Sequence, residues 1–349
     1  MGDSIALGET LNLRCIFLSG PEWVHQRLRE ADALIELAGE SQNAELALFG
    51  HRWRLVSMLE LGETEAAERE LEAYERVSDQ ARAGSARWYA LTLHATRAFV
   101  EGRLEEAERL TLEAFAQRRR EPTELTVYTF GVQLLWLRRE QGRLSELAPY
   151  VRAHPLDSRI PMMAAFRATA ALLDLETGSP EDAREQLARL AENDLADLPR
   201  DFTYLYGLAV LSELCAALGD PACAATLYDA LRPFADRQVV LFMGTVYLGS
   251  AERYLGQLAA TMGNGERAEA HFEEALRSNE RVRARLWVAH TQLDWARMLL
   301  ARGGADATAR AEELLGSCRA TASELGLAGL LGKAEALASQ LRGETPSTR

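Results

Sequence analysis

The chain has 349 residues, of which 48% are hydrophobic and 26% are charged, and only 10 are proline. Its formal net charge of −13 argues against direct binding to DNA or RNA, because an acidic surface repels phosphate groups. The many Ala, Leu, Glu and Arg residues are strong helix formers and predict an all-α protein.

The cysteine content and the hydropathy of the sequence indicate in which cellular compartment the chain is expected. Four scattered cysteines, Cys15, Cys215, Cys223 and Cys318, show no spacing suited to zinc binding or a disulfide framework. No run approaches the roughly 20 apolar residues that a membrane span requires, and no signal peptide precedes the first expected helix. We therefore expect a soluble, cytoplasmic protein with reduced thiols and no membrane partner.

A glycine recurs along the chain at intervals of 36 to 44 residues, and the residue five positions later is usually alanine. The glycines are Gly20, Gly62, Gly102, Gly142, Gly178, Gly219, Gly263 and Gly304. The residues five positions later are His25, Ala67, Ala107, Leu147, Ala183, Ala224, Ala268 and Ala309. A fixed period of about 20–50 residues indicates a stacked repeat architecture.

Each period holds two amphipathic stretches that meet at the glycine, which predicts a helical hairpin. Residues 43–61 and 64–78 form one pair, and residues 85–101 and 104–118 form the next. We expect the glycine to be left-handed where the first helix ends, and the alanine to let the two helices approach closely. The whole pattern predicts a right-handed α–α superhelix of about eight helix pairs.

The breaks between pairs and the two chain ends complete the expected organisation. Longer breaks are expected at 79–84, 154–160, 192–201 and 235–243, and we expect the superhelix to change pitch near 192–201. Residues 329–341 predict one C-terminal capping helix. Residues 1–342 are thus expected to form a single solenoid domain, and the polar segment 343–349 a disordered tail.

One unit matches a known repeat well. Tyr254-Leu255-Gly256, Leu258-Ala259, Gly263, Ala268, Phe272 and Ala275-Leu276 resemble the tetratricopeptide (TPR) pattern of a Leu-Gly pair, a turn glycine, an alanine and an aromatic residue. The other units match in part, because their periods near 40 exceed the standard length of about 34 residues.

Longer units of this kind resemble the tetratricopeptide-like region of bacterial signalling ATPase regulators. These include the maltose-regulator (MalT-like) type, large ATP-binding regulators of the LuxR type, and cyclases with ATPase and repeat regions. The resemblance rests on residues 131–144, 197–201, 247–256 and 295–303 and covers nearly the whole chain. It implies a sensor and scaffold region that works with an ATPase or regulator partner.

Stacked helix pairs create a concave surface lined by the first helix of each pair. Tetratricopeptide offsets, counted back from each turn glycine, place a set of arginine, aromatic and polar residues toward this groove. Arginine and aromatic side chains dominate recognition energetics, so we expect the set to bind a protein segment or a small effector. The predicted groove residues are Arg52, Tyr89, Trp136, Arg139, Tyr206, Glu213, Arg253, Gln257 and Asp294.

Catalytic and metal-binding patterns are weak. His290 and Asp294 are four residues apart on one helix face, a spacing compatible with a metal site, but no third ligand is visible. Gly332-Lys333-Ala334 does not fit a phosphate-binding loop, and no nucleophile turn appears. We therefore expect no catalytic residues, metal or cofactor.

The leading hypothesis is a non-enzymatic, effector-binding scaffold or sensor region of a bacterial transcriptional or signalling regulator. Two alternatives stay open. One is a small-molecule enzyme or biosynthetic accessory protein that uses a pocket in the concave groove, with buried, perturbed acids or histidines as its signature. The other is a homo-oligomeric scaffold, in the simplest case a homodimer.

Overall fold

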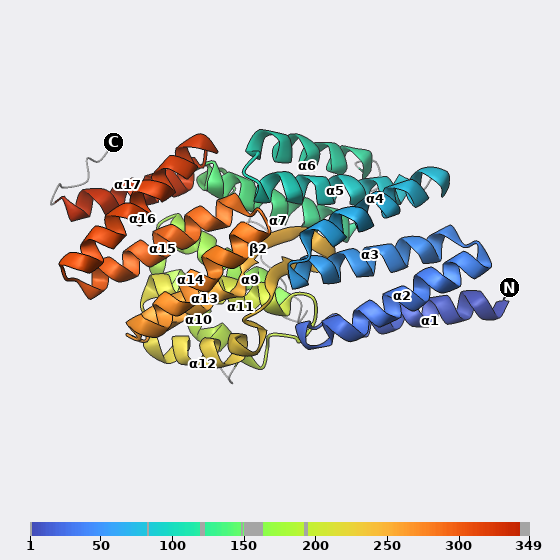
Figure 1. The fold of residues 1–349 in the computed structure, drawn as a ribbon, viewed down its shortest axis with the longest axis horizontal. Coiled ribbons are helices and arrows are strands. Elements are labelled where there is room, and N and C mark those ends of the chain that lie inside the picture. Colours follow the sequence, from blue (N-terminus) through green and yellow to red (C-terminus); the bar gives the residue numbers. More distant parts are fainter. Residues whose placement is uncertain are drawn as a thin grey trace.

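The computed structural model describes residues 2–81, 84–118, 123–147, 149, 163–191 and 195–342. Over these residues the chain forms 16 α-helices and one two-stranded sheet (Figure 1). The helices are α1 (Gly2–Phe17), α2 (Val24–Ser41), α3 (Ala44–Leu61), α4 (Thr64–Ala81), α5 (Gly84–Val100), α6 (Leu104–Arg118), α7 (Glu124–Glu140), α9 (Met163–Glu176), α10 (Pro180–Ala191), α11 (Tyr204–Leu218), α12 (Pro221–Leu231), α13 (Ala251–Thr261), α14 (Gly265–Arg281), α15 (Arg285–Arg302), α16 (Ala305–Glu324) and α17 (Ala328–Leu341).

The helices pack in consecutive pairs, such as α3 with α4 and α13 with α14, which confirms the predicted helical repeat solenoid. The packing of one pair shows why the repeat sequence works. A side-chain carbon added at Gly256 of α13 would lie 2.7 Å from the ring of Phe272 on α14. The Leu-Gly and aromatic positions of the repeat therefore meet across the helix pair.

All but one of the turn glycines have the predicted positive φ, but Gly304, with ψ 151°, lies outside the left-handed helical region and precedes α16 instead of ending α15. Positive φ angles of 70° to 97° occur at Gly62, Gly102, Gly142, Gly178, Gly219, Gly263 and Gly304. Gly20 instead has an extended backbone, with φ −64° and ψ 151°, and precedes the 3-10 turn Pro21–Trp23. Its added side-chain carbon would lie 2.9 Å from the carbonyl oxygen of Arg200, so a close backbone approach explains this glycine.

The alanines of the repeat are buried between paired helices, again with one exception. Ala67, Ala107, Ala183, Ala224 and Ala268 are 4% exposed or less. Each is the fourth residue of its helix, which begins two residues after the turn glycine. In the last pair α16 begins directly after Gly304, so Ala309 lies one position further along the helix and is exposed, whereas Ala307 is buried.

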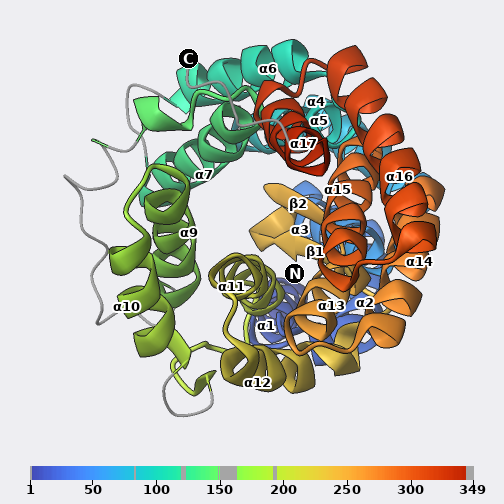
Figure 2. The same cartoon turned by 90° about the vertical axis from the view of Figure 1, so that its left-hand side faces the viewer.

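The pairs wind around a ring, which Figure 2 shows from one end. From α7 onward, the odd-numbered helices α7, α9, α11, α13, α15 and α17 form its inner wall, and the even-numbered helices lie outside them. The ring closes where α17 packs on α7. A side-chain carbon at Gly329 would lie 2.2 Å from the carbonyl oxygen of Arg139, so only glycine permits this contact.

A β-hairpin fills the interior near α3 and α5 (Figure 2). The expected break at 235–243 covers its first strand, but its second strand lies in a stretch that the sequence assigns to a helical repeat, so that assignment is wrong there. Strand β1 (Gln238–Leu241) pairs antiparallel with β2 (Val246–Ser250), and all of their residues are buried. The hairpin tip is held by side chains from the helices. The Tyr89 hydroxyl donates to the Met243 carbonyl over 2.8 Å, and Gln133 Nε2 donates to the Thr245 carbonyl over 3.0 Å.

The other expected segments have mixed outcomes. Helix α17 corresponds to the expected capping helix, and α4 runs three residues past the expected end at 78. The expected break at 154–160, the tail at 343–349 and most of the second helix of the fourth pair lie outside the described residues. Within the described part of the chain, every helix is too short or too polar to cross a lipid bilayer.

Enlarging a buried repeat alanine should separate the two helices of its pair. We expect Ala268→Leu, at a fully buried position, to lower the free energy of unfolding by about 1–3 kcal/mol, because the packed interface has no room for three more carbons. The matched control is Ala309→Leu, which is exposed at the same repeat position and should change it by less than about 0.5 kcal/mol. Urea titration of both variants measures the difference, and equal effects would contradict the packing described here.

Candidate functional site

Seven of the nine predicted groove residues meet at the centre of the ring. They are Trp136, Arg139, Tyr206, Glu213, Arg253, Gln257 and Asp294, and all but Glu213 are 8% exposed or less. Their side chains contact one another across the superhelix axis instead of lining an open groove. Their role in ligand binding therefore stays a prediction, while their role in joining the inner helices follows from their contacts.

Arg139 on α7 is the hub of the first half of this network. Its Nη2 atom lies 2.6 Å from Glu176 Oε1 on α9, and its Nε atom donates to the same carboxylate over 3.1 Å. The Nη2 atom also pairs with the Glu213 carboxylate on α11. One buried arginine thus ties together three inner helices.

Arg253 on α13 is the hub of the second half. Its Nε atom donates to Asp294 Oδ2 on α15 over 2.7 Å, and Gln257 Nε2 donates to the same oxygen over 2.8 Å. Arg253 Nη1 lies 3.6 Å from Glu213 Oε2, which joins the two halves. Glu213 therefore lies between two buried arginines.

Two further side-chain contacts, to Glu140 and Glu176, close the ring between segments that are far apart in the sequence. His290 Nε2 on α15 lies 3.0 Å from both carboxylate oxygens of Glu140 on α7. Lys333 Nζ on α17 lies 2.5 Å from Glu176 Oε1 on α9. We name these residues together the axial network: Arg139, Glu140, Glu176, Glu213, Arg253, Gln257, His290, Asp294 and Lys333. Each of the six inner helices contributes to it.

Aromatic side chains pack beside the axial network. Trp136 Nε1 lies 3.2 Å from the Tyr206 hydroxyl, which is 2.7 Å from Thr169 Oγ1. The rings of Trp136 and Trp287 meet edge to face, with centroids 6.2 Å apart.

The other two predicted groove residues lie elsewhere, in the N-terminal repeats. Tyr89 holds the hairpin tip, and the Arg52 guanidinium lies over the rings of Phe49 and Trp53.

Neighbouring cations keep the carboxyls of Glu176 and Glu213 ionised. Burial by itself raises the pKa of Glu176, but the charges of Arg139 and Lys333 outweigh it and lower that pKa to about 2. The same balance, with Arg139 and Arg253 as the cations, lowers the pKa of Glu213. Carboxylates with such low pKa values are poor proton donors at neutral pH, so this cluster is suited to joining helices.

Sequence reasoning missed the acids that complete the network, although a signal for them exists. Glu60, Glu140 and Glu176 each stand two residues before a turn glycine. Each of them pairs with a basic side chain; Glu60 does so with the buried Arg27 over 2.5 Å. His290 and Asp294, the spaced pair of the sequence, face different partners, and the described residues contain no cluster of three or more side chains that could hold a metal ion.

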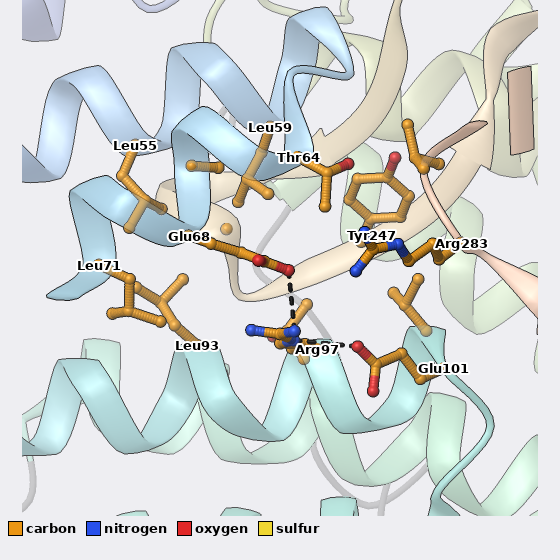
Figure 3. A pocket seen from close by; sticks show the side chains of 15 residues that line it. Leu55, Leu59, Thr64, Glu68, Leu71, Leu93, Arg97, Glu101, Tyr247 and Arg283 are labelled. Atoms are coloured by element: carbon orange, nitrogen blue, oxygen red, sulfur yellow. Dashed lines mark hydrogen bonds and ion pairs between the residues drawn. The ribbon is translucent and has the colours of Figure 1, made fainter.

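An apolar hollow of about 80 Å³ lies outside the ring axis, and we call it the flank pocket (Figure 3). Leucines of α3, α4 and α5 line one side of it, among them Leu55, Leu71 and Leu93. Tyr247 of the hairpin and Arg283 of the turn between α14 and α15 line the other side. The flank pocket thus joins the second and third repeats to the seventh.

Charged groups stand at the mouth of the flank pocket. Arg97 pairs with Glu68 over 2.8 Å and with Glu101 over 2.9 Å (Figure 3). The hydrogen bonds from Arg97 and Arg103 outweigh burial and lower the pKa of Glu101. Arg283 has a side chain that is 63% exposed, and its nearest acid, Glu65, is 4.0 Å away, so its guanidinium is accessible to an anionic group.

Breaking the axial network should destabilise the whole chain. We expect Arg139→Met to lower the free energy of unfolding by about 3–5 kcal/mol, because it leaves the carboxylates of Glu176 and Glu213 buried with less compensation. Arg109→Met removes an exposed ion pair on α6 and should change it by less than about 0.5 kcal/mol. Denaturant titration compares the two variants, and a small effect at Arg139 would contradict the role assigned to it.

The low pKa of Glu176 predicts how stability depends on pH. A carboxyl whose pKa is about 2 in the folded chain and near its ordinary 4.5 in the unfolded chain stabilises the fold above the higher value. That contribution is lost as pH falls from about 4.5 toward 2. We therefore expect Glu176→Gln to flatten the fall in melting temperature over this window, whereas Glu72→Gln, which alters an exposed acid of α4, should leave the fall unchanged. If melting temperature falls with pH in the same way for Glu176→Gln and the parent chain, Glu176 does not have the stabilising role described here.

Comparison with known proteins assigns no family to the chain. No protein family matches the chain. No curated protein matches it either. Among solved structures, the chain is similar to a "circular tandem repeat protein with novel repeat topology and enhanced subunit contact surfaces". The identity is 16%, the alignment covers 97% of this chain and 96% of that one, and the TM-score is 0.21.

Proposed function

We propose that the chain is a non-enzymatic, tetratricopeptide-like sensor region that binds a small apolar effector in the flank pocket. The observation that supports this most is the place of the pocket. Its walls come from α3 to α5 on one side and from the hairpin and the α14–α15 turn on the other. An occupant therefore contacts parts of the solenoid that are about two hundred residues apart in sequence.

The chemistry of the pocket favours an apolar body with an acidic end. Leucines form one wall of the hollow and most of the exposed lining is apolar, so the part of a ligand that enters it must be small and apolar. Arg97 is already paired with two glutamates, so Arg283 is the cation at the rim that offers free donors to a carboxylate or sulfonate.

Occupancy of this pocket supplies a mechanism for sensing. A ligand shifts a conformational equilibrium only by its difference in affinity between two states. A pocket shared by distant repeats has full affinity only when those repeats keep their relative positions. The bound effector would therefore favour the closed superhelix, and its loss would favour states in which neighbouring repeats slide.

The resemblance to bacterial signalling regulators supplies the wider context of the proposal. In that context the chain is cytoplasmic and transmits the bound state to an ATPase or an output partner. The enzyme alternative is less supported, because Glu176 and Glu213, two acids of the axial network, are paired with arginines and have lowered pKa values. The alternative of a homo-oligomeric scaffold would rest on the exposed apolar residues of α1, such as Leu13 and Phe17.

A fluorescent probe with an apolar body and a sulfonate, 1-anilinonaphthalene-8-sulfonate, tests the proposal. We expect saturable binding at one site, with affinity at least tenfold weaker in Thr64→Trp, because the indole would fill the mouth of the pocket. The control is Thr308→Trp, which also lies near the start of the second helix of a pair but does not line the pocket, and it should bind like the parent chain. The proposal fails if the probe does not saturate or if both variants bind it equally.

A further inference from the structure

A second hollow, of about 280 Å³, lies beside the hairpin tip, and we call it the aromatic pocket. Thr245 of the tip lines it, whereas the neighbouring Gly244 lines the flank pocket, so the tip is a wall shared by both hollows. Its remaining walls come from the first half of α7, the start of α9 and the segment that precedes α11. The lining residues are Glu124, Leu125, Tyr128, Thr129, Val132, Phe166, Phe202, Leu241, Phe242 and Thr245.

Four aromatic rings dominate this lining, and they come in two contacting pairs. Tyr128 and Phe166 have ring centroids 5.8 Å apart and nearly parallel planes, and Phe202 and Phe242 have centroids 4.4 Å apart. All four side chains are only partly buried, so each keeps ring surface that a ligand can contact. The faces of aromatic rings carry partial negative charge and attract cations.

The charge of the lining residues also favours a cationic ligand. None of the lining residues is lysine, arginine or histidine, and the one charged group among them is the carboxylate of Glu124, which is exposed at the start of α7. An anionic ligand would meet both this carboxylate and the negative ring faces. A cation is attracted by both.

The kind of cation follows from hydration. A metal ion or a primary ammonium group is strongly hydrated and needs several hydrogen-bond acceptors to replace its water. The aromatic pocket offers few, since two threonines and Tyr128 are its only lining hydroxyls. A trialkylated ammonium group spreads its charge over methyl groups, sheds water more easily and contacts aromatic surface directly.

We propose that the aromatic pocket binds a small organic cation with a quaternary or trialkylated ammonium head. Tyr128, Phe166, Phe202 and Phe242 contact the head through their rings, and Glu124 contributes long-range attraction at the rim. This site is separate from the flank pocket and does not depend on the function proposed for that pocket.

Choline and its neutral isostere 3,3-dimethylbutan-1-ol provide the test, because the two differ in charge but hardly in shape. Calorimetric titration of the full chain should show choline binding at least about fivefold tighter than the isostere. Phe166→Leu and Phe242→Leu should each weaken choline binding by about fivefold while leaving isostere binding nearly unchanged. Glu124→Gln, at an exposed position that does not endanger folding, should weaken choline binding about twofold to threefold at low salt.

Two control variants test whether a loss of choline binding is specific to the aromatic pocket. Phe130→Leu alters a ring of α7 that stacks on Phe115 and does not line the pocket, so it should leave choline binding unchanged. Thr64→Trp, which blocks the flank pocket, should also leave it unchanged, and the two proposals can therefore fail separately. Absent choline binding, equal affinity for the isostere, or full choline affinity in both Phe166→Leu and Phe242→Leu would overturn the inference.

Discussion

The closed arrangement of the inner helices depends on two buried arginines that share one carboxylate. Arg139 and Arg253 both lie beside Glu213, and each holds a second acid on a neighbouring inner helix. A buried guanidinium that lost these partners would be strongly destabilising, so the helices that carry the acids must stay within reach. Lys333 and His290 extend the same constraint to the helices that complete the ring.

This constraint changes where ligands can bind. In an open superhelix the concave wall is the working surface, whereas here the corresponding side chains contact one another between the inner helices. Two hollows lie on either side of the hairpin tip, namely the flank pocket and the aromatic pocket. The tip itself is fixed by Tyr89, Thr96 and Gln133, so two ligand sites would share one firmly anchored wall.

The sequence predicts the local part of this fold well and the long-range part poorly. Turn glycines and alanines such as Gly263 and Ala268 report contacts within one helix pair, and such contacts leave a periodic pattern. The tetratricopeptide offsets likewise identify residues of the inner wall, including Arg139 and Arg253. No local pattern shows that residues of different inner helices meet. Glu140 and His290, for example, are in contact although they are 150 residues apart in the sequence. The hairpin was missed for the same reason, because its anchor Tyr89 lies 154 residues from Met243.

Ring closure is tested most directly by one distance. A side-chain carbon added at Gly142, after α7, would lie 3.4 Å from the backbone nitrogen of Gly329 in α17. The neighbouring Ser145 and Ala328 are exposed and are suitable positions for spin labels. Pulsed electron paramagnetic resonance on the doubly labelled full chain should give one narrow distribution at the short end of the measurable range. A broad or long distribution at neutral pH would mean that the superhelix is open and that the axial network does not hold it closed.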